Sequence, residues 1–600
     1  MRHRAALRHY CKEHAPPCPQ YHLLTSPMQA RNWPKSRSPC PEPQNTACLS
    51  AGGAIPRPWQ KAPGSVYSPT RTGRRIRQAV SRQPHLAGTH TAHMRRMQPM
   101  DIRFQNLGPE HWKGEIMLAP VCQDEVLTEI CPQMDKAAPW LAIAPALRDF
   151  KGKTGELALM HGHPELAVPR VLAVGLGPRE KVDTAGIRKA VAAAVQLCRQ
   201  KGFGSILLPE PALARLPGGR ERLVEECVCA SLLALYRFTA LKKAEKDEPA
   251  EPQWLALGFD GQEVPDASHA AARKGENAAW AVMLARDLAS TPPNLLYPEK
   301  LAERARELAR EKGFACTVLD EHELEKESMG CLLAVGQGSG RPPRLVILEH
   351  APEGHEQEKP LILVGKGITF DTGGISLKPA ANMHQMKADM TGAATVLATL
   401  AALAQEDAPR RVIGLLACAE NMPGGRAMRP GDVVRAANGD SVEIQNTDAE
   451  GRLALCDALA YAQKTWTPAA LVDIATLTGA CAVALGTQIA GLFSDDADLA
   501  ERIRAAGGAC GEEYWPLPLW KPYAEQLKSD VADICHMGPR EGGAINAALF
   551  LQHFIQEGVR WAHLDIAGVD WVSKPTPLCP AGPSAFGART LLELARGGVL

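Results

Sequence analysis

Two carboxylates and a guanidinium stand at alternate positions in the stretch NTDAEGR, residues 446–452. In an extended segment, successive side chains point to opposite faces, so Asp448, Glu450 and Arg452 would share one face. Such a face offers hard oxygen ligands for a divalent cation, beside a permanently charged group that can hold an anion. The same residues fit a helix start, with Asp448 as N-cap, Glu450 in the first turn and a helix over 453–464. Taken alone, the stretch favours the helix start, because caps are commoner than metal sites.

A second charged stretch follows an apolar run at 361–364, which predicts a buried strand. Glycines are frequent from there to residue 374, and they permit tight turns and close approach of the backbone to a ligand. Buried charges must be paired or must bind a metal. The stretch therefore predicts either internal Lys–Asp ion pairs or a metal site, formed by Lys366, Asp371, Lys378 and Asp389.

Together the two stretches resemble the leucine aminopeptidase (cytosol aminopeptidase) family. NTDAEGR is similar to the family's signature, and VGKGITFDTGG with the following SLKP and KADM resembles its other metal-site segment. The resemblance is specific because every functional position is present, at compatible spacing, in two distant segments. It covers residues 270–600 densely and 101–270 more loosely. Its further motifs are PPNLLYP (292–298), LLAVGQGSGRPPRLVILE (332–349), AENMPGGRAMRPGDV (419–433), LKSDVADI (527–534), GGAINAALFL (542–551) and HLDIAG (563–568).

The resemblance implies two divalent cations, Mn²⁺ or Zn²⁺, in each subunit. Asp371 and Glu450 match ligands that bridge both cations, Lys366 and Asp389 match ligands of one, and Asp448 matches a ligand of the other. Clustered carboxylates repel one another unless cations neutralise them, which is consistent with this assignment. Two cations about 3.5–4 Å apart can share a water, lower its pKa and hold the scissile carbonyl. Lysine would bind a metal only as a neutral amine, a form that adjacent cations favour.

Lys378 and Arg452 match the family's catalytic pair. As a cation, Lys378 would stabilise the oxyanion of a tetrahedral intermediate, and Arg452 would hold a bicarbonate-like anion that relays the proton. One metal would bind the α-amine, so the implied substrates have a free N-terminus, and sites that face the inner cavity of the family's hexamer would admit only short peptides. Asp570 stands where the family often has a small or apolar residue; it would admit basic side chains if it faces the substrate, and otherwise it turns outward. An apolar pocket for Leu or Met is matched by Met386, Thr476, Gly479 and Ala567.

The first hundred residues differ from the rest of the 600-residue chain. They hold 16 Lys and Arg against two Asp and Glu, whereas the other 500 residues hold 51 against 64. Without apolar periodicity, residues 1–100 are predicted to form a disordered basic extension. The composition favours a start site placed too far upstream, with Met97 or Met100 as the true start. A transit peptide and a basic arm that binds nucleic acid or an acidic surface are the alternatives.

Two α/β domains are expected after this extension. Residues 101–268 alternate strand and helix patterns, and the resemblance implies that this domain is noncatalytic and contributes to assembly. A linker at 262–275 leads to the catalytic domain, 269–600, in which alternation predicts a largely parallel sheet flanked by helices. The turn at 437–441 predicts a hairpin that leads into NTDAEGR. Strand candidates of this domain include 332–335, 361–364, 411–418 and 470–475.

The resemblance implies a metal-dependent aminopeptidase that releases Leu and other apolar N-terminal residues in intracellular peptide turnover. Two alternatives stay open: a dipeptidase or cysteinylglycine hydrolase with the same two metals, and a nucleic-acid-binding assembly that uses the basic extension. Cysteines without paired CxxC spacing fit reduced thiols in a cytoplasmic protein. No convincing membrane span or secretory signal is present. The family packs as a homohexamer with its sites facing an inner cavity, and the resemblance implies the same assembly here.

Overall fold

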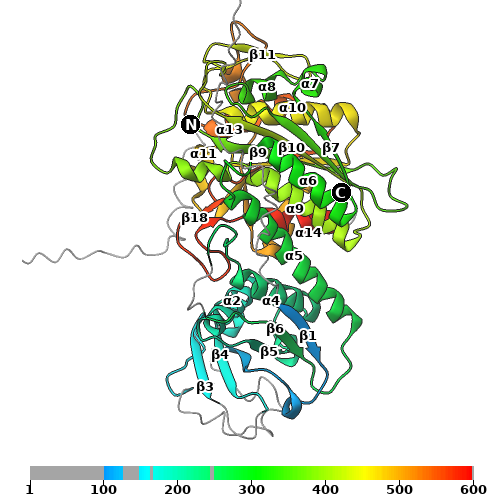
Figure 1. Ribbon diagram of the computed structural model, residues 1–600, viewed down its shortest axis with the longest axis vertical. Helices are drawn as coiled ribbons and strands as arrows, with labels where there is room; N and C mark the ends of the chain where they lie inside the picture. The colour runs from blue at the N-terminus through cyan, green and yellow to red at the C-terminus, as the bar shows by residue number, and fades with distance from the viewer. Residues whose placement is uncertain (1–99, 124, 126–146, 162–166, 244–248, 598–600) are drawn as a thin grey trace, which may run out of the picture. The chain divides into compact units, whose positions relative to one another are not determined.

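The computed structural model describes residues 100–597, apart from 124, 126–146, 162–166 and 244–248 (Figure 1). The predictions made for residues 1–99 (disorder, a start at Met97, a nucleic-acid-binding arm) lie outside the described residues. Within the described part of the chain, no helix has both the length and the apolar character that crossing a membrane requires.

A six-stranded sheet follows Met100, in the strand order β1-β6-β5-β2-β4-β3. Neighbouring strands pair in parallel except β3, which is antiparallel to β4. The alternation of strands and helices expected for this region is confirmed. The elements are β1 (Asp101–Gln105), β2 (Ile116–Cys122), β3 (Leu157–His161), β4 (Arg170–Gly177), α2 (Thr184–Gln200), β5 (Ser205–Pro209), α3 (Glu210–Ala214), α4 (Arg220–Leu235) and β6 (Trp254–Gly258). Of the helices, α2 packs on β2, β4 and α4.

The linker expected at 262–275 is wrong from residue 266 onward, because α5 runs without a break over Asp266–Ser290. Its polar residues suggested a linker, but small residues on one face pack closely against α4. A Cβ at Gly275 would lie 2.3 Å from the carbonyl oxygen of Glu225, so only glycine permits this approach. Tight helix packing, rather than sequence polarity, therefore decides the structure of this segment.

The second sheet has eight strands in the order β15-β14-β17-β13-β9-β10-β8-β7. Its central strands β17, β13, β9 and β10 pair in parallel, and antiparallel pairs join β14 to β17, β8 to β10 and β7 to β8. The expected α/β class is confirmed, with a mixed sheet around a parallel centre. The strands are β7 (Ala315–Leu319), β8 (Arg344–His350), β9 (Leu361–Asp371), β10 (Val412–Asn421), β13 (Ala470–Ala475), β14 (Ile489–Phe493), β15 (Glu513–Pro516) and β17 (Trp561–Asp565).

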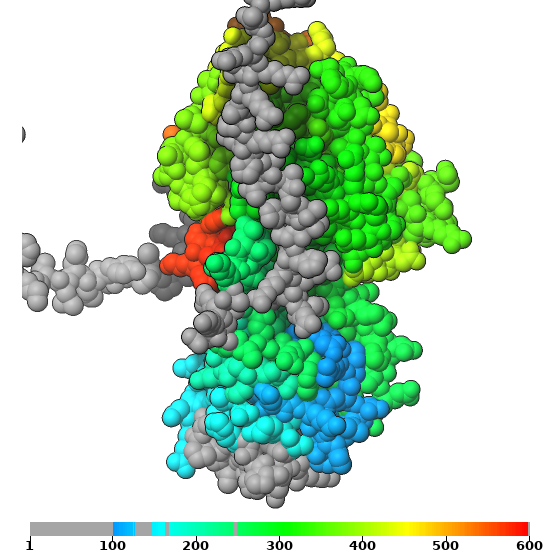
Figure 2. Space-filling view, viewed as in Figure 1, coloured from blue at the N-terminus to red at the C-terminus, as the bar shows by residue number. Residues whose placement is uncertain are grey.

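Helices cover both faces of this sheet (Figure 1). On one face α9 (Thr391–Glu406) packs on β9, β10 and β13, with α5, α6 (Pro298–Lys312) and α14 (Ala588–Arg596) against it. On the other face α10 (Glu450–Thr465) contacts β9 and β10, next to α8 (Gly330–Gly336) and α13 (Gly543–His553). Helix α6 falls in the green part of the colour range in Figure 2. The remaining helices are α7 (Glu321–Lys326), α11 (Gly479–Leu485) and α12 (Ala497–Cys510).

The strand expected at 332–335 is wrong, because these residues form most of the short helix α8. A short apolar run cannot be assigned to a buried strand or a buried helix by periodicity alone. The hairpin expected at 437–441 is confirmed: β11 (Val433–Arg435) and β12 (Ser441–Glu443) are antiparallel, with Gly439 at φ +99° in the turn. Two further short pairings involve β16 (Ile534–Cys535), which is parallel to β12, and β18 (Trp571–Val572) with β19 (Gly582–Pro583).

Candidate active site

The stretch 446–452 is a tight turn followed by the first turn of α10. The Asn446 carbonyl accepts from the Ala449 N–H (3.1 Å), and its side-chain oxygen accepts from the Asp448 N–H (3.0 Å). Because α10 begins at Glu450, the extended arrangement that would align alternate side chains is wrong. The helix start is confirmed, but Ala449 holds the N-cap position and Asp448 does not cap. The Asp448 carboxylate is therefore turned toward the neighbouring charged residues.

Strand β9 carries two of the charged residues to the same place. It is longer than expected and continues through Gly365 and Gly367 to Asp371. The glycines are required because the start of α9 lies against the strand: a Cβ at Gly365 would lie 2.5 Å from the carbonyl oxygen of Gly392. Lys366 and Asp371 are 3% and 2% exposed, so both charges are buried near the carboxyl end of a central parallel strand.

Lys366 lies within ion-pair distance of two carboxylates. Its Nζ is 2.9 Å from Asp389 and 2.9 Å from Glu450 Oε1, and it donates to the Thr476 carbonyl at 3.0 Å. The Thr476 hydroxyl donates to Asp389 at 2.6 Å. Lys366, on β9, is therefore held between Asp389, two residues before the start of α9, and Glu450, the first residue of α10.

Lys378 makes the second set of ion pairs. Its Nζ lies 2.8 Å from Asp371 Oδ2 and 2.5 Å from Asp448 Oδ1. Its side chain is 23% exposed, against 4% for Lys366. The structure thus contains the Lys–Asp ion pairs that the sequence predicted as one alternative. The same contacts bring together all the residues that the other alternative, a metal site, requires.

The cluster holds more negative than positive charge. Two ammonium groups face the carboxylates of Asp371, Asp389, Asp448 and Glu450. Burial raises the pKa of Asp371, Asp389 and Asp448, and the charge of Glu450 raises the pKa of the first two further. Burial lowers the pKa of Lys366, but the carboxylates beside it raise that pKa above its ordinary value overall. Two carboxylates in excess, in a cluster where three of the four are buried, are unfavourable unless they protonate or bind cations.

These residues fit divalent cations. Asp371, Asp389 and Glu450 each offer a carboxylate oxygen, and the three oxygens lie within 4.8 Å of one another. Glu450 Oε2 is buried and has no hydrogen-bond partner among the described residues. Oxygen-rich sites of this kind suit Mn²⁺, Mg²⁺ or Zn²⁺. Asp448 and Lys366 stand beside these three, so all five predicted metal ligands are in one cluster.

Asn421 is a site residue that the sequence did not reveal. The strand expected at 411–418 runs on to Asn421, which ends β10 and is 1% exposed. Its amide donates to Asp371 Oδ1 (2.8 Å) and to the Thr447 carbonyl (3.0 Å). It thus orients one carboxylate and fixes the turn before α10. The available signal was its place in AENMPGG, directly after a buried strand.

Arg452 lies in the first turn of α10 and is 6% exposed. It donates through Nη1 to the His536 carbonyl at 2.9 Å, and its Nε has no hydrogen-bond partner among the described residues. Burial lowers its pKa to about 10, against the opposing effect of Glu450 and Asp565. A buried cation with an unused N–H group can hold a small anion.

One of the predicted pocket residues, Thr476, contacts this cluster. Met386, Thr476 and Ala567 are half-buried and Gly479 is exposed. Thr476 contacts both Lys366 and Asp389, as described above. Asp570 is 5% exposed, so the alternative that it turns outward is wrong. Burial raises the pKa of Asp570 to about 7, and a hydrogen bond from Thr391 opposes that rise.

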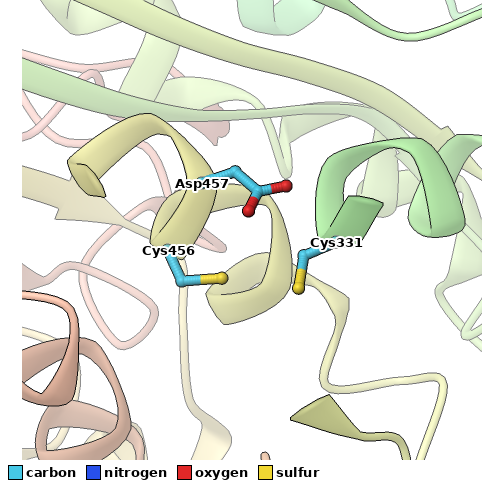
Figure 3. Close-up of side chains that lie close together, drawn as sticks. All are labelled: Cys331, Cys456 and Asp457. Carbon is cyan, nitrogen blue, oxygen red and sulfur yellow. The ribbon is translucent and has the colours of Figure 1, made fainter. Parts of the chain in front are cut away.

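A second group of potential metal-ligating side chains lies elsewhere on α10 (Figure 3). Cys456 and Asp457 project from α10 toward Cys331 on the facing helix α8, and all three are fully buried. Asp457 Oδ2 accepts from the Leu332 N–H (2.9 Å) and its Oδ1 from the Ala437 N–H (2.8 Å). Because both carboxylate oxygens already serve backbone donors, this group ties α8 and the β11–β12 hairpin to α10 and is structural.

Replacing Asp457 by alanine is expected to destabilise the protein by about 3 kcal/mol, because it leaves one buried and one half-buried N–H group unpaired, at about 1–3 kcal/mol each. A lower urea midpoint would show this. The exposed Glu356→Ala is the control, with an expected change within about 0.5 kcal/mol. Equal midpoints for the two variants would contradict the structural role of Asp457.

Comparison with known protein families assigns this fold and site to one class of protein. Residues 283–592 match the model of the cytosol aminopeptidase family, catalytic domain, and residues 120–245 match that of the cytosol aminopeptidase family, N-terminal domain. The chain therefore belongs to the cytosol aminopeptidase family, and it is a metal-dependent aminopeptidase, a hydrolase. The resemblance seen in the two charged stretches is confirmed.

Individual relatives agree with this assignment. The chain is 53% identical to the "Probable cytosol aminopeptidase" of Nitratidesulfovibrio vulgaris over 504 aligned residues. The alignment covers 83% of this chain and 99% of that protein. The chain is 46% identical over 509 residues to the protein of the same name from Oleidesulfovibrio alaskensis, with 83% and 99% covered.

Two solved structures are also similar. The bottromycin maturation enzyme BotP in complex with Mn has a TM-score of 0.71 at 36% identity, over 81% of this chain and 99% of that one. A variant of tomato leucine aminopeptidase has a TM-score of 0.73 at 31% identity, over 83% and 96%.

Proposed function

We propose that this protein is a leucyl aminopeptidase that uses two divalent metal ions to release Leu and other apolar N-terminal residues from short peptides. The observation that carries the proposal is the cluster of four carboxylates, three of them buried, around only two lysines. Such an excess of buried negative charge is stable when divalent cations occupy it. Membership of the cytosol aminopeptidase family supports the reaction class.

Side chains of this protein would have separate roles in the proposed reaction. Bound metal ions would supply a water of lowered pKa and a Lewis acid for the scissile carbonyl. Lys378 is the more exposed of the two lysines, so it can approach a substrate oxygen and stabilise negative charge there. Arg452 would hold a bicarbonate ion through its unused Nε–H and orient it to accept and return a proton. Thr476, Met386, Gly479 and Ala567 would contact an apolar N-terminal side chain.

The metal ions are proposed to be Mn²⁺ or Zn²⁺, and the solved complex of BotP with Mn supports the first. A homohexamer in the cytoplasm, active in peptide turnover, is proposed as well. Exposed large apolar side chains support subunit contacts; they include Leu377, Val483, Trp515, Trp520 and Val531. The described cysteines are all free, which fits a reducing compartment.

Removal of metal tests the proposed function. The full 600-residue chain, treated with a chelator and then dialysed, should lose hydrolysis of Leu-p-nitroanilide, and added Mn²⁺ or Zn²⁺ should restore it. The reason is that the lysines alone cannot supply an activated water. Glu450→Ala should stay inactive with either metal. If a folded, metal-loaded protein cleaves Cys-Gly but not Leu-p-nitroanilide, the dipeptidase alternative replaces the leucyl aminopeptidase.

A further inference from the structure

His536 links the segment after β16 to the turn that precedes α10. It follows directly on Cys535, which pairs with Glu443 of β12, and its own N–H donates to the Glu443 carbonyl at 3.1 Å. The side chain is fully buried, and its ring lies edge-on to Phe550 of α13 at 6.4 Å between centroids. The ring is therefore fixed between the small sheet and a core helix.

Both ring nitrogens of His536 contact the backbone of the residues that lead into the active-site turn. Nδ1 accepts from the Gln445 N–H at 3.3 Å and lies 3.1 Å from the Glu443 carbonyl oxygen. Because Nδ1 accepts from the Gln445 N–H, the single proton of a neutral ring is on Nε2, which donates it to the Asn446 carbonyl oxygen at 2.9 Å. Burial lowers the pKa of His536 to about 4, with a further contribution from Arg452, so the ring is neutral.

The contact with Asn446 acts on the metal-ligating residues through the backbone. The Asn446 carbonyl accepts from Nε2 of His536 and from the Ala449 N–H, so the imidazole fixes one end of the turn that contains Asp448. Glu450 follows this turn directly. A shift of the Asn446 carbonyl would thus move the carboxylates of both Asp448 and Glu450 relative to β9.

The backbone of His536 acts on the catalytic arginine. Its carbonyl oxygen accepts the Nη1–H of Arg452 at 2.9 Å. The same residue therefore contacts the start of the 446–449 turn with its ring and the guanidinium of Arg452 with its carbonyl. Contacts of this one residue thus reach both the turn before α10 and a charged side chain of α10.

We propose that His536 is a positioning residue: its ring sets the turn that carries Asp448 and leads into Glu450, and its carbonyl orients the guanidinium of Arg452. The expected effect of a His536 substitution on turnover rests on the proposed function. The expected effect on Mn²⁺ affinity does not, because binding can be measured without any turnover. The proposal also assigns a role to the motif LKSDVADI. Ser529 of this motif donates to Glu443 (2.6 Å), and Asp533 accepts from the Ser441 N–H (2.8 Å), so the motif attaches the segment before His536 to β12.

Three substitutions separate positioning from simple packing. Glutamine can place an amide N–H near the position of Nε2, asparagine reaches only the position of Nδ1, and phenylalanine fills the space without polar atoms. We expect His536→Asn and His536→Phe to lower kcat about 10–100-fold and to weaken Mn²⁺ binding by about tenfold, as loss of a partner behind a ligand does. His536→Gln should recover both to within about fivefold, and KM for Leu-p-nitroanilide should change little.

The measurements are Mn²⁺ titration calorimetry, steady-state kinetics and thermal unfolding of the full chain. His553→Asn, an exposed histidine paired with Asp440, is the matched control and should behave as the unchanged protein. The proposal is overturned if His536→Phe binds Mn²⁺ normally, or if His536→Gln is as impaired as His536→Asn. If the unchanged protein binds Mn²⁺ but does not hydrolyse Leu-p-nitroanilide, the proposed function fails, and the order of Mn²⁺ affinities still tests His536.

Discussion

Replacing Glu450 by glutamine should stabilise the metal-free protein and at the same time abolish its activity. Glutamine keeps the shape of the side chain but removes one of four clustered negative charges. Lys366 keeps its contact with Asp389, and the repulsion that raises the pKa of Asp371 and Asp389 is relieved. We expect the apparent melting temperature without metal to rise by about 1–3 °C.

The same variant should lose its response to metal. Mn²⁺ at about 100 times its dissociation constant stabilises the unchanged protein by about 2.7 kcal/mol, and this rise should be absent in Glu450→Gln. Hydrolysis should fall at least about a thousandfold, equivalent to about 4 kcal/mol of transition-state stabilisation. Thermal unfolding with and without Mn²⁺, beside turnover of Leu-p-nitroanilide, measures both effects.

This experiment also decides between the two alternatives that the sequence left open for the charged stretches. If the Lys366–Glu450 contact were mainly a structural ion pair, breaking it would destabilise the metal-free protein, since a lone buried charge is costly. A lower melting temperature would therefore contradict the metal site. Glu349→Gln, at a half-buried Glu–Arg pair with Arg411, is the control and should leave turnover unchanged.

Replacing Lys378 by glutamine should lower turnover while leaving Mn²⁺ binding intact. Lys378 contacts Asp371 and Asp448 but is accessible enough to reach a substrate, so its charge is available to the oxyanion. Loss of such a group lowers kcat about 10²–10³-fold. Removing a cation from the carboxylate cluster makes it more negative, so Mn²⁺ affinity should be unchanged or higher. KM should change by less than about threefold, as expected for an interaction made only in the transition state.

Kinetics and Mn²⁺ titration of the same samples check this prediction. Lys300→Gln removes a lysine from the surface helix α6, where it pairs with Glu303, and should change neither quantity. Weaker Mn²⁺ binding in Lys378→Gln, or a raised KM with normal kcat, would assign Lys378 to binding instead of to the chemical step.

Much of the fold could be predicted because its signals are local. Apolar strand patterns, the glycine-rich turns and the NTDAEGR stretch each depend on neighbouring residues, and the hairpin before α10 followed from Asn438–Gly439. Errors arose where packing overrode the local pattern. The apolar run 332–335 became helix α8, and the polar segment from 266 became part of α5 because Gly275 permits close contact with α4.

The amino-acid sequence alone specifies the chemistry: which charged residues are present, how they are spaced in two motifs, and hence which family of peptidases they resemble. How those charges are held depends on the folded chain. Asn421 meets Asp371 across 50 residues and His536 meets Asn446 across 90. Such pairs are created by strands and turns that folding brings together, and the polar side chains in them look ordinary in the sequence. The residue types follow from the chemistry, whereas their partners follow from the register and packing of distant elements.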